Sequence, residues 1–211
     1  MKSKRSLGQN FFVNSNLGNH IVDIVREESS NCLVEIGPGM GFFTERLIPF
    51  LKEITVVEKD SNLASNLKLQ YPSINVVNID FLDLDLNTLN PECTYFGSLP
   101  YNVSKPIIKK ILQSSNFSKK SYFIVQKEVA EKYIYKPPYS SLSLHTYIYA
   151  QCKKILDISP HSFRPKPNVE SSLISFTPVK RDITNLHMLD ELIEMSFKQP
   201  RRSEERRVGK E

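Results

Sequence analysis

The sequence predicts an α/β fold, Rossmann-like, in which a mostly parallel sheet carries helices on both faces. Three observations lead to this prediction: short apolar runs recur along the chain, segments with helical spacing separate them, and the connections are short. Strands that alternate with helices form parallel sheets, because each helix carries the chain back across the sheet. With 211 residues, 40% of them hydrophobic, the chain suffices for one domain with a sizeable core and a short appendage.

The expected strands are short runs of Val, Ile, Leu and aromatic residues, bounded by polar residues or glycine. In chain order they are 32–36, 54–57, 74–77, 95–96 and 121–125. Two later runs, 154–158 and 171–176, are expected to pair as a closing hairpin across a long loop.

The expected helices show apolar residues at intervals of three and four. The first covers about 16–28, and the next follows the first strand over 42–52. Asp60 stands where an N-cap belongs, ahead of a helix through Leu69. Ser104 and Pro106 open a further helix, since proline fits a first helical turn, and an amphipathic helix is expected over 188–197.

Charge and cysteine content restrict the partners and the compartment. A formal charge of +5 and a pI near 9.0 favour a polyanionic partner, although only weakly. Cys32 and Cys152 are expected to be buried free thiols, and no C-x-x-C pair or histidine spacing indicates a metal site. No apolar leader or run of membrane-spanning length occurs, so we expect a soluble protein in a reducing, cytoplasmic compartment.

Three signals at the ends of successive strands predict a nucleoside pocket. In such sheets, ligands bind beyond the carboxyl ends of the strands. The first strand ends in a turn with Gly37 and Gly39, which lets the backbone approach a ligand. Glu58 ends the second strand, where a carboxylate accepts hydrogen bonds from ribose hydroxyls, and Asp80 ends the third, where it can accept from an adenine amine. These signals do not separate S-adenosylmethionine from NAD.

The segment after the fourth strand favours methyl transfer. Pro100 has no N–H and biases Leu99 away from helical angles, so the segment is stiff. Its carbonyls, with the side chain of Ser98, can accept two hydrogen bonds from an –NH2 group and orient the lone pair of the nitrogen toward an electrophilic methyl group. Tyr101 offers a flat face on which a flipped base can stack. These four residues are the candidate catalytic residues.

Six collinear segments then stand out: Leu7-Gly-Gln-Asn-Phe11, Glu35-Ile-Gly-Pro-Gly39, Val57-Glu58, Asp80, Gly97-Ser-Leu-Pro-Tyr-Asn-Val-Ser104 and Gln126-Lys-Glu128. Together they resemble the ribosomal RNA adenine dimethyltransferases of the KsgA type, from about Lys4 to Pro178. The resemblance implies a class I S-adenosylmethionine-dependent methyltransferase with a seven-stranded sheet. It also implies dimethylation of two adjacent adenosines near the 3′ end of small-subunit ribosomal RNA during ribosome biogenesis.

The same resemblance assigns expected roles to individual residues. Residues 1–15 would form a flap over S-adenosylmethionine. The implied cofactor contacts are Gln9, Asn10, Phe12, Gly37, Gly39, Glu58, Asp80 and Ser98. On the RNA side, Phe163 would sandwich the target base against Tyr101, Asn102 would contact the substrate, and Arg164 and Lys166 would reach phosphates.

The chain departs from the family pattern in two places. Ser98 stands where the family has Asn, and its shorter side chain leads us to expect reduced activity. Relatives continue into a compact helical domain, whereas residues 179–211 are expected to be a truncated or replaced remnant of it with a charged tail, after a methyltransferase domain over 1–178.

Three alternatives remain open beside this reading. An Erm-type enzyme would methylate adenine in large-subunit ribosomal RNA, and a non-catalytic RNA-binding assembly factor would use the same fold. An NAD-dependent dehydrogenase is disfavoured, because the glycines form G-x-G-x-G rather than G-x-G-x-x-G. The expected partner is small-subunit ribosomal RNA or the immature small subunit, bound by a monomer without a metal or a membrane.

Overall fold

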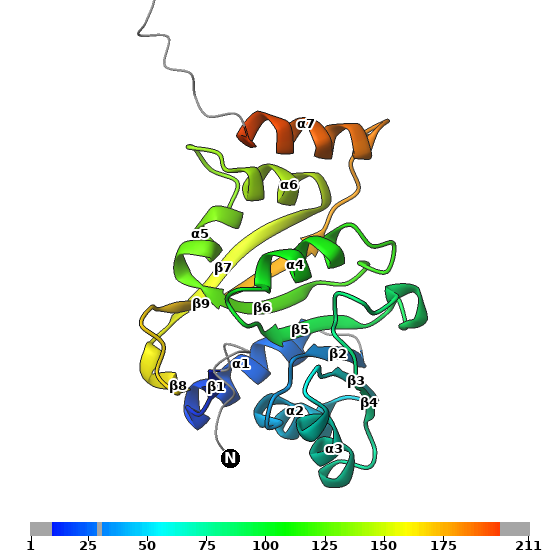
Figure 1. Ribbon diagram of the computed structural model, residues 1–211, viewed down its shortest axis with the longest axis vertical. Coiled ribbons are helices and arrows are strands. Elements are labelled where there is room, and N and C mark those ends of the chain that lie inside the picture. Colours follow the sequence, from blue (N-terminus) through cyan, green and yellow to red (C-terminus); the bar gives the residue numbers. More distant parts are fainter. Residues whose placement is uncertain (1–9, 29–30, 199–211) are drawn as a thin grey trace, which may run out of the picture.

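The computed structural model describes residues 10–28 and 31–198, which form a sheet with helices on both faces (Figure 1). Seven strands join in the order β4-β3-β2-β5-β6-β9-β7. They are β2 (Cys32–Ile36), β3 (Glu53–Val57), β4 (Asn75–Val77), β5 (Thr94–Ser98), β6 (Ser121–Gln126), β7 (Ala150–Ile158) and β9 (Ser171–Pro178). The first five are parallel, and β9 lies antiparallel between β6 and β7. The expected closing hairpin is confirmed.

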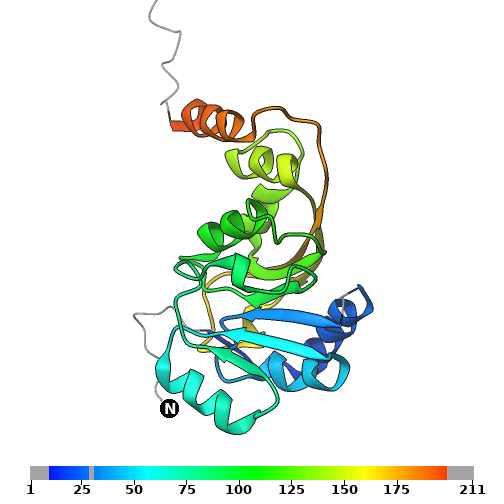
Figure 2. The same cartoon turned by 90° about the vertical axis from the view of Figure 1, so that its right-hand side faces the viewer.

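Two apolar cores, one on each face of the sheet, hold the helices. The bounds of the helices are α1 (Ser15–Glu28), α2 (Phe42–Leu47), α3 (Ser61–Gln70), α4 (Ser104–Leu112), α5 (Lys127–Tyr133), α6 (Ser141–Tyr149) and α7 (Leu186–Lys198). Leu33 packs in the core with α1, α2 and α3, whereas Val34 and Ile36 pack in the core with α4 and α5. Successive side chains of a strand point to opposite faces, so β2 supplies both cores. Figure 2 separates the two faces, with α1 to the right of the sheet and α4 to its left.

One predicted helix differs from the one observed, and two helices were missed. The helix expected over 42–52 ends as α2 at Leu47 and continues as a 3₁₀ turn through Pro49, which cannot donate to an α-helical hydrogen bond. Helices α5 and α6 were not expected. A reciprocal cap between Ser140 and Ser143 begins α6, and it is the signal that would have revealed this helix.

Helix α7 confirms the helix expected over 188–197 and packs against α6 through a buried carboxylate. Asp190 accepts from the Tyr149 hydroxyl (2.5 Å) and the Gln113 amide (2.8 Å), and lies 2.7 Å from Nδ1 of His145. Burial opposes ionisation of Asp190, but these hydrogen bonds outweigh it and lower the pKa of the carboxyl. The boundary expected at residue 178 stays a prediction, and residues 199–211 lie outside the described chain.

The expectation of a free thiol at Cys32 is wrong. Cys32 forms a disulfide with Cys93, whereas Cys152 is free and half-buried. The reason is the register of two neighbouring strands: Leu33 of β2 pairs with Thr94 of β5, so the residues that precede them lie side by side. With Glu53, these cysteines are the one cluster of metal-ligand residue types among the described residues, and the disulfide leaves neither sulfur as a thiolate that could bind a metal. Within the same ranges, no helix combines the length and the apolar character needed to cross a membrane.

The N-cap of α3 provides a test of local stability. The Asp60 carboxylate accepts from the backbone N–H groups of Asn62 (2.9 Å) and Leu63 (3.4 Å), as predicted. Replacement of an N-cap acceptor costs about 1 kcal/mol, so Asp60→Ala should lower the midpoint of thermal unfolding by about 2–4 °C. Circular dichroism measures the change. Asp60→Asn keeps an acceptor and serves as the control, and an equal loss in both variants would contradict the capping role.

Candidate functional site

A cavity of about 260 Å³ opens at the carboxyl ends of the parallel strands. This volume is just below the range of roughly 300–1,000 Å³ found for small-molecule sites. The predicted site residues that line it are Asn10, Phe12, Gly37, Gly39, Glu58, Asp80, Ser98, Leu99, Pro100, Tyr101, Asn102 and Phe163. Residues from both ends of the methyltransferase region therefore meet at one place. Gln9 lies outside the described residues.

The glycine turn after β2 forms one wall of the cavity. Gly37 and Gly39 have φ values of 64° and 59°, in the left-handed region that side chains disfavour. A Cβ on Gly39 would come within 3.0 Å of the Phe11 ring, whereas nothing lies within 4 Å of the corresponding position on Gly37. Glycine is thus required by conformation at both positions, and Gly37 leaves open space beside the backbone.

Glu58, at the end of β3, ties that turn to the neighbouring strand. Its side chain is buried, with Oε2 accepting from the N–H of Gly39 (3.2 Å) and Oε1 from the N–H of Asp60 (2.8 Å). Burial raises the pKa of Glu58, and these two hydrogen bonds oppose the rise. Each carboxylate oxygen has a second lone pair, so both can accept from a ligand as well.

Glu35 is a second buried carboxyl at the cavity that was not assigned a role from the sequence. It accepts a 2.6 Å hydrogen bond from the Thr44 hydroxyl. Burial raises the pKa of Glu35 to about 7, against the effect of Thr44, and the charge of Glu58 adds to the rise. An acidic residue inside the apolar run 32–36 was the available signal, since carboxylates are rarely buried without a reason.

Asp80 enters the cavity already paired. Its Oδ2 lies 2.6 Å from Nζ of Lys59, and its Oδ1 accepts from the N–H of Leu82 (3.0 Å). The hydrogen bond from Lys59 is the main reason that the pKa of Asp80 is lowered. Lys59 was not predicted, because nothing in its sequence context distinguishes it from a solvated lysine.

The segment after β5 is held at both ends. The N–H of Leu99 donates to the carbonyl of Ile124 (3.1 Å), which extends the pairing with β6 beyond Ser98. The Tyr101 hydroxyl lies 2.7 Å from Oγ of Ser171, a fully buried residue at the start of β9. The ring of Tyr101 is therefore anchored by its far edge. Ser171 was missed, because it is 70 residues away in sequence.

Residues 11–13 pair with the proline-rich loop beside the cavity. Strand β1 (Phe11–Phe12) is antiparallel to β8 (Phe163–Arg164), and the N–H of Val13 donates to the carbonyl of Ser162 (2.8 Å). The Phe163 ring packs edge-on against Phe12, with centroids 5.2 Å apart. Phe163 thus reaches the cavity together with Tyr101, but its ring is buried against Phe12 rather than presented as a free face.

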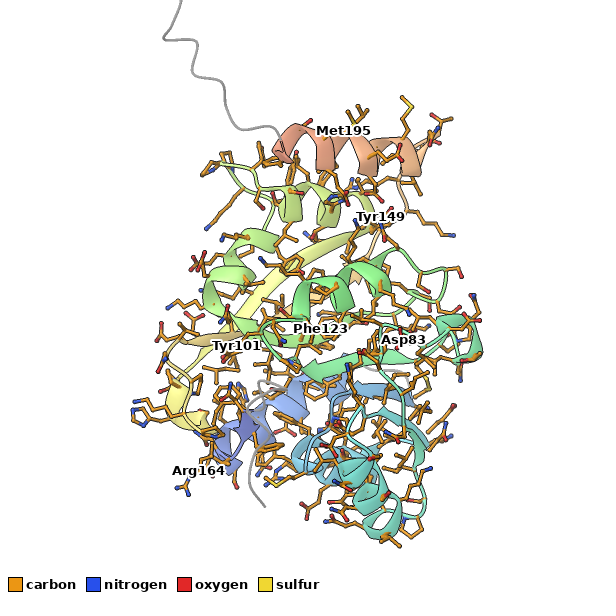
Figure 3. The ribbon with its side chains drawn as sticks, viewed as in Figure 1. Asp83, Tyr101, Phe123, Tyr149, Arg164 and Met195 are labelled. Carbon is orange, nitrogen blue, oxygen red and sulfur yellow. A yellow bond between two sulfur atoms is a disulfide. The ribbon has the colours of Figure 1, made fainter. Side chains whose placement is uncertain are left out.

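Two predicted residues lie outside the cavity. Arg164 is exposed and points away from the molecule beside β8 (Figure 3). Lys166 is also exposed, with Nζ 3.2 Å from Nε2 of His161. Neither of them lines the cavity, so the structure gives them no contact with a small molecule inside it.

Comparisons with known proteins identify the family of this chain. The model of the family described as "Ribosomal RNA adenine dimethylase" matches residues 1–207. The ribosomal RNA small subunit methyltransferase A of Malacoplasma penetrans is 37% identical over 207 residues, 95% of this chain and 76% of that protein. The protein of the same name from Francisella tularensis subsp. tularensis is 33% identical, over 96% of this chain and 82% of its own length.

Solved structures show the same fold at lower identity. A dimethyladenosine transferase from Plasmodium falciparum matches with a TM-score of 0.71 at 24% identity, over 80% of this chain and 63% of that one. The 23S rRNA methyltransferase ErmE matches with a TM-score of 0.74 at 23% identity, over 89% and 79%. These matches confirm the predicted fold of class I S-adenosylmethionine-dependent methyltransferases. With a family model that covers nearly its whole length, the chain belongs to the ribosomal RNA adenine dimethylase family.

Proposed function

We propose that this protein transfers methyl groups from S-adenosylmethionine to N6 of two adjacent adenosines near the 3′ end of small-subunit ribosomal RNA. The observation that carries the proposal is the single cavity that joins the glycine turn, Glu58 and Asp80 to the segment from Ser98 to Tyr101. The named relatives, at 33–37% identity, are small-subunit enzymes, which favours this substrate over the large-subunit alternative. We further propose that the protein acts as a monomer in the cytoplasm, on the immature small subunit.

The residues of the cavity fit the cofactor. Gly37 has open space where a side chain would stand. The carboxylate of the buried Glu58 accepts hydrogen bonds from the backbone N–H groups of Gly39 and Asp60 and can accept more from a ligand. Glu58 would accept from the ribose hydroxyls and Asp80 from the adenine amine, with Asn10, Phe12 and Gly39 closing around the ligand. When bound, S-adenosylmethionine supplies an electrophilic methyl group on a sulfonium.

The protein contributes to the reaction by positioning the target base rather than by supplying a strong general base. Ser98 and the carbonyls around Pro100 accept hydrogen bonds from the target amine and orient its lone pair, while Tyr101 stacks on the base. Phe163 and Asn102 line the cavity beside the base, and Arg164 and Lys166 hold phosphates at the rim. Fixing two reactants in line supplies much of the acceleration, and a closed site excludes competing water.

A methylation assay tests the function directly. Unmethylated small ribosomal subunits, with labelled S-adenosylmethionine, should become labelled at two adjacent adenosines, and large-subunit ribosomal RNA should not. Label in the large subunit alone would favour the Erm-type alternative. Binding of the cofactor without any transfer would favour a non-catalytic assembly factor, which Ser98 keeps as the second candidate.

Glu58→Gln should weaken cofactor binding about 10- to 100-fold, because hydrogen bonds to a charged acceptor contribute about 1.5–3 kcal/mol. Isothermal titration calorimetry measures the affinity. Glu53→Gln, at the other end of the same strand, is the matched control and should bind normally. Unchanged affinity in Glu58→Gln, in a variant with normal thermal stability, would remove Glu58 from the cofactor site.

Ser98→Asn should raise kcat, because the longer amide side chain reaches the target amine better than a hydroxyl does. A catalytic hydrogen bond that is weakened slows a reaction by roughly 10²–10³, which sets the upper limit of the gain. Multiple-turnover methylation of small subunits at saturating substrate measures kcat, and Ser98→Ala should be slower than the native protein. Equal turnover of the native and Asn variants would show that position 98 does not limit the reaction.

Ser171→Ala should raise KM for RNA about 3- to 10-fold, because the Tyr101 ring loses the hydrogen bond that fixes its edge. Cofactor affinity should not change, since Ser171 does not line the cavity. Ser171→Thr keeps the hydroxyl and should restore most of the native KM. A loss of cofactor affinity equal to the loss for RNA would indicate a general structural defect instead.

A further inference from the structure

Three tyrosines and an arginine form an exposed column away from the cavity. The Tyr135 ring lies between those of Tyr139 (centroids 4.7 Å apart) and Tyr147 (4.2 Å, stacked). The Arg181 guanidinium covers Tyr147, 3.7 Å from its centroid, and donates through Nε to the Tyr147 carbonyl. We call these four residues the tyrosine stack. None of them has a role in the proposed reaction.

The tyrosine stack is fixed in place by the fold. Tyr147 is on α6, Arg181 follows β9, and Tyr135 and Tyr139 belong to the loop between α5 and α6. Pro137 and Pro138 stand between those two tyrosines and restrict the backbone of the loop, which lowers the entropy lost when a ligand binds. In Figure 1 this loop lies on the left-hand side of the molecule. The arrowheads of β5 and β6 point toward the same side, and β8 lies there too. The tyrosine stack is thus on the side of the molecule to which the strands of the site lead.

Its rings remain accessible although they stack on each other. Tyr135, Tyr139 and Tyr147 are 45%, 46% and 39% exposed. The exposed charged chain neighbours of the stack are two lysines, Lys136 and Lys180, and one carboxylate, Asp182. The structure gives neither lysine an ion pair among the described residues. The exposed aliphatic side chains gather elsewhere, on α7.

Aromatic faces flanked by cations suit one kind of partner. Unpaired bases of RNA stack on aromatic side chains, and lysines beside them contact the phosphates. We propose that the tyrosine stack is a second RNA-binding surface, on which an unpaired base of the ribosomal RNA substrate stacks against the outer ring, Tyr139. This inference rests on the proposed function. It adds a second contact with the substrate RNA, at a point distant from the reacting base.

Tyr139→Ala should weaken binding to protein-free small-subunit ribosomal RNA about 5- to 10-fold, because it removes one stacking face. Tyr139→Phe keeps the face and should bind like the native protein. Leu69→Ala is the surface control, since Leu69 is 81% exposed on α3. At saturating RNA, kcat and the affinity for S-adenosylmethionine should be unchanged in all three variants. In Lys136→Gln the slope of log affinity against log salt should fall by roughly 0.7–0.9.

Each remaining outcome has a defined meaning. Native affinity in Tyr139→Ala, with methylation intact, overturns the RNA-binding surface and leaves the proposed function standing. If Tyr139→Ala weakens binding to assembled subunits but not to protein-free RNA, the tyrosine stack contacts a ribosomal protein. If Tyr139→Ala changes the oligomeric state, the stack contacts a second copy of the chain. Either result overturns the proposal. Failure of the native protein to bind or methylate RNA would instead contradict the proposed function itself.

Discussion

The parallel register of three neighbouring strands determines where the site forms. Ile36 pairs with Val57 across β2 and β3, and Glu35 pairs with Phe96 across β2 and β5. Because strands in parallel register end at the same edge, the turns that follow them open toward one another. The hydrogen bond from Gly39 to Glu58 then locks two of these turns together before any ligand arrives. The contacts proposed for the cofactor at Gly37, Gly39, Glu58 and Ser98 depend on this alignment.

Burial gives the carboxyls of the site a different character from those at the surface. Glu35 and Glu58 are both enclosed, and burial raises the pKa of each, whereas the ion pair with Lys59 lowers the pKa of the more exposed Asp80. A binding site of this kind offers acceptors whose hydrogen-bonding geometry is already set, which reduces the reorganisation needed when a ligand binds.

The parts of the fold that could be predicted are those with local signals. Each parallel strand is a short apolar run, and Asp60 caps α3 by contacts within three residues, so both were visible in the sequence. Those cavity residues that were predicted each follow a strand or lie in a motif shared with a family. Local patterns gave little sign of contacts between distant segments. The pairing of Cys32 with Cys93, the anchoring of Tyr101 by Ser171, and the packing of Phe163 on Phe12 all depend on tertiary structure that brings together residues 61 to 151 positions apart.

The pairing of β1 with β8 links the two sides of the cavity mechanically. Phe12 is on the strand that borders the expected nucleoside, and Phe163 is on the strand that borders the expected base. Their rings are in contact, so displacement of one strand carries the other with it. If both ligands bind as proposed, a movement of this pair caused by one ligand would change the affinity for the other, and by reciprocity the two affinities would change by the same factor.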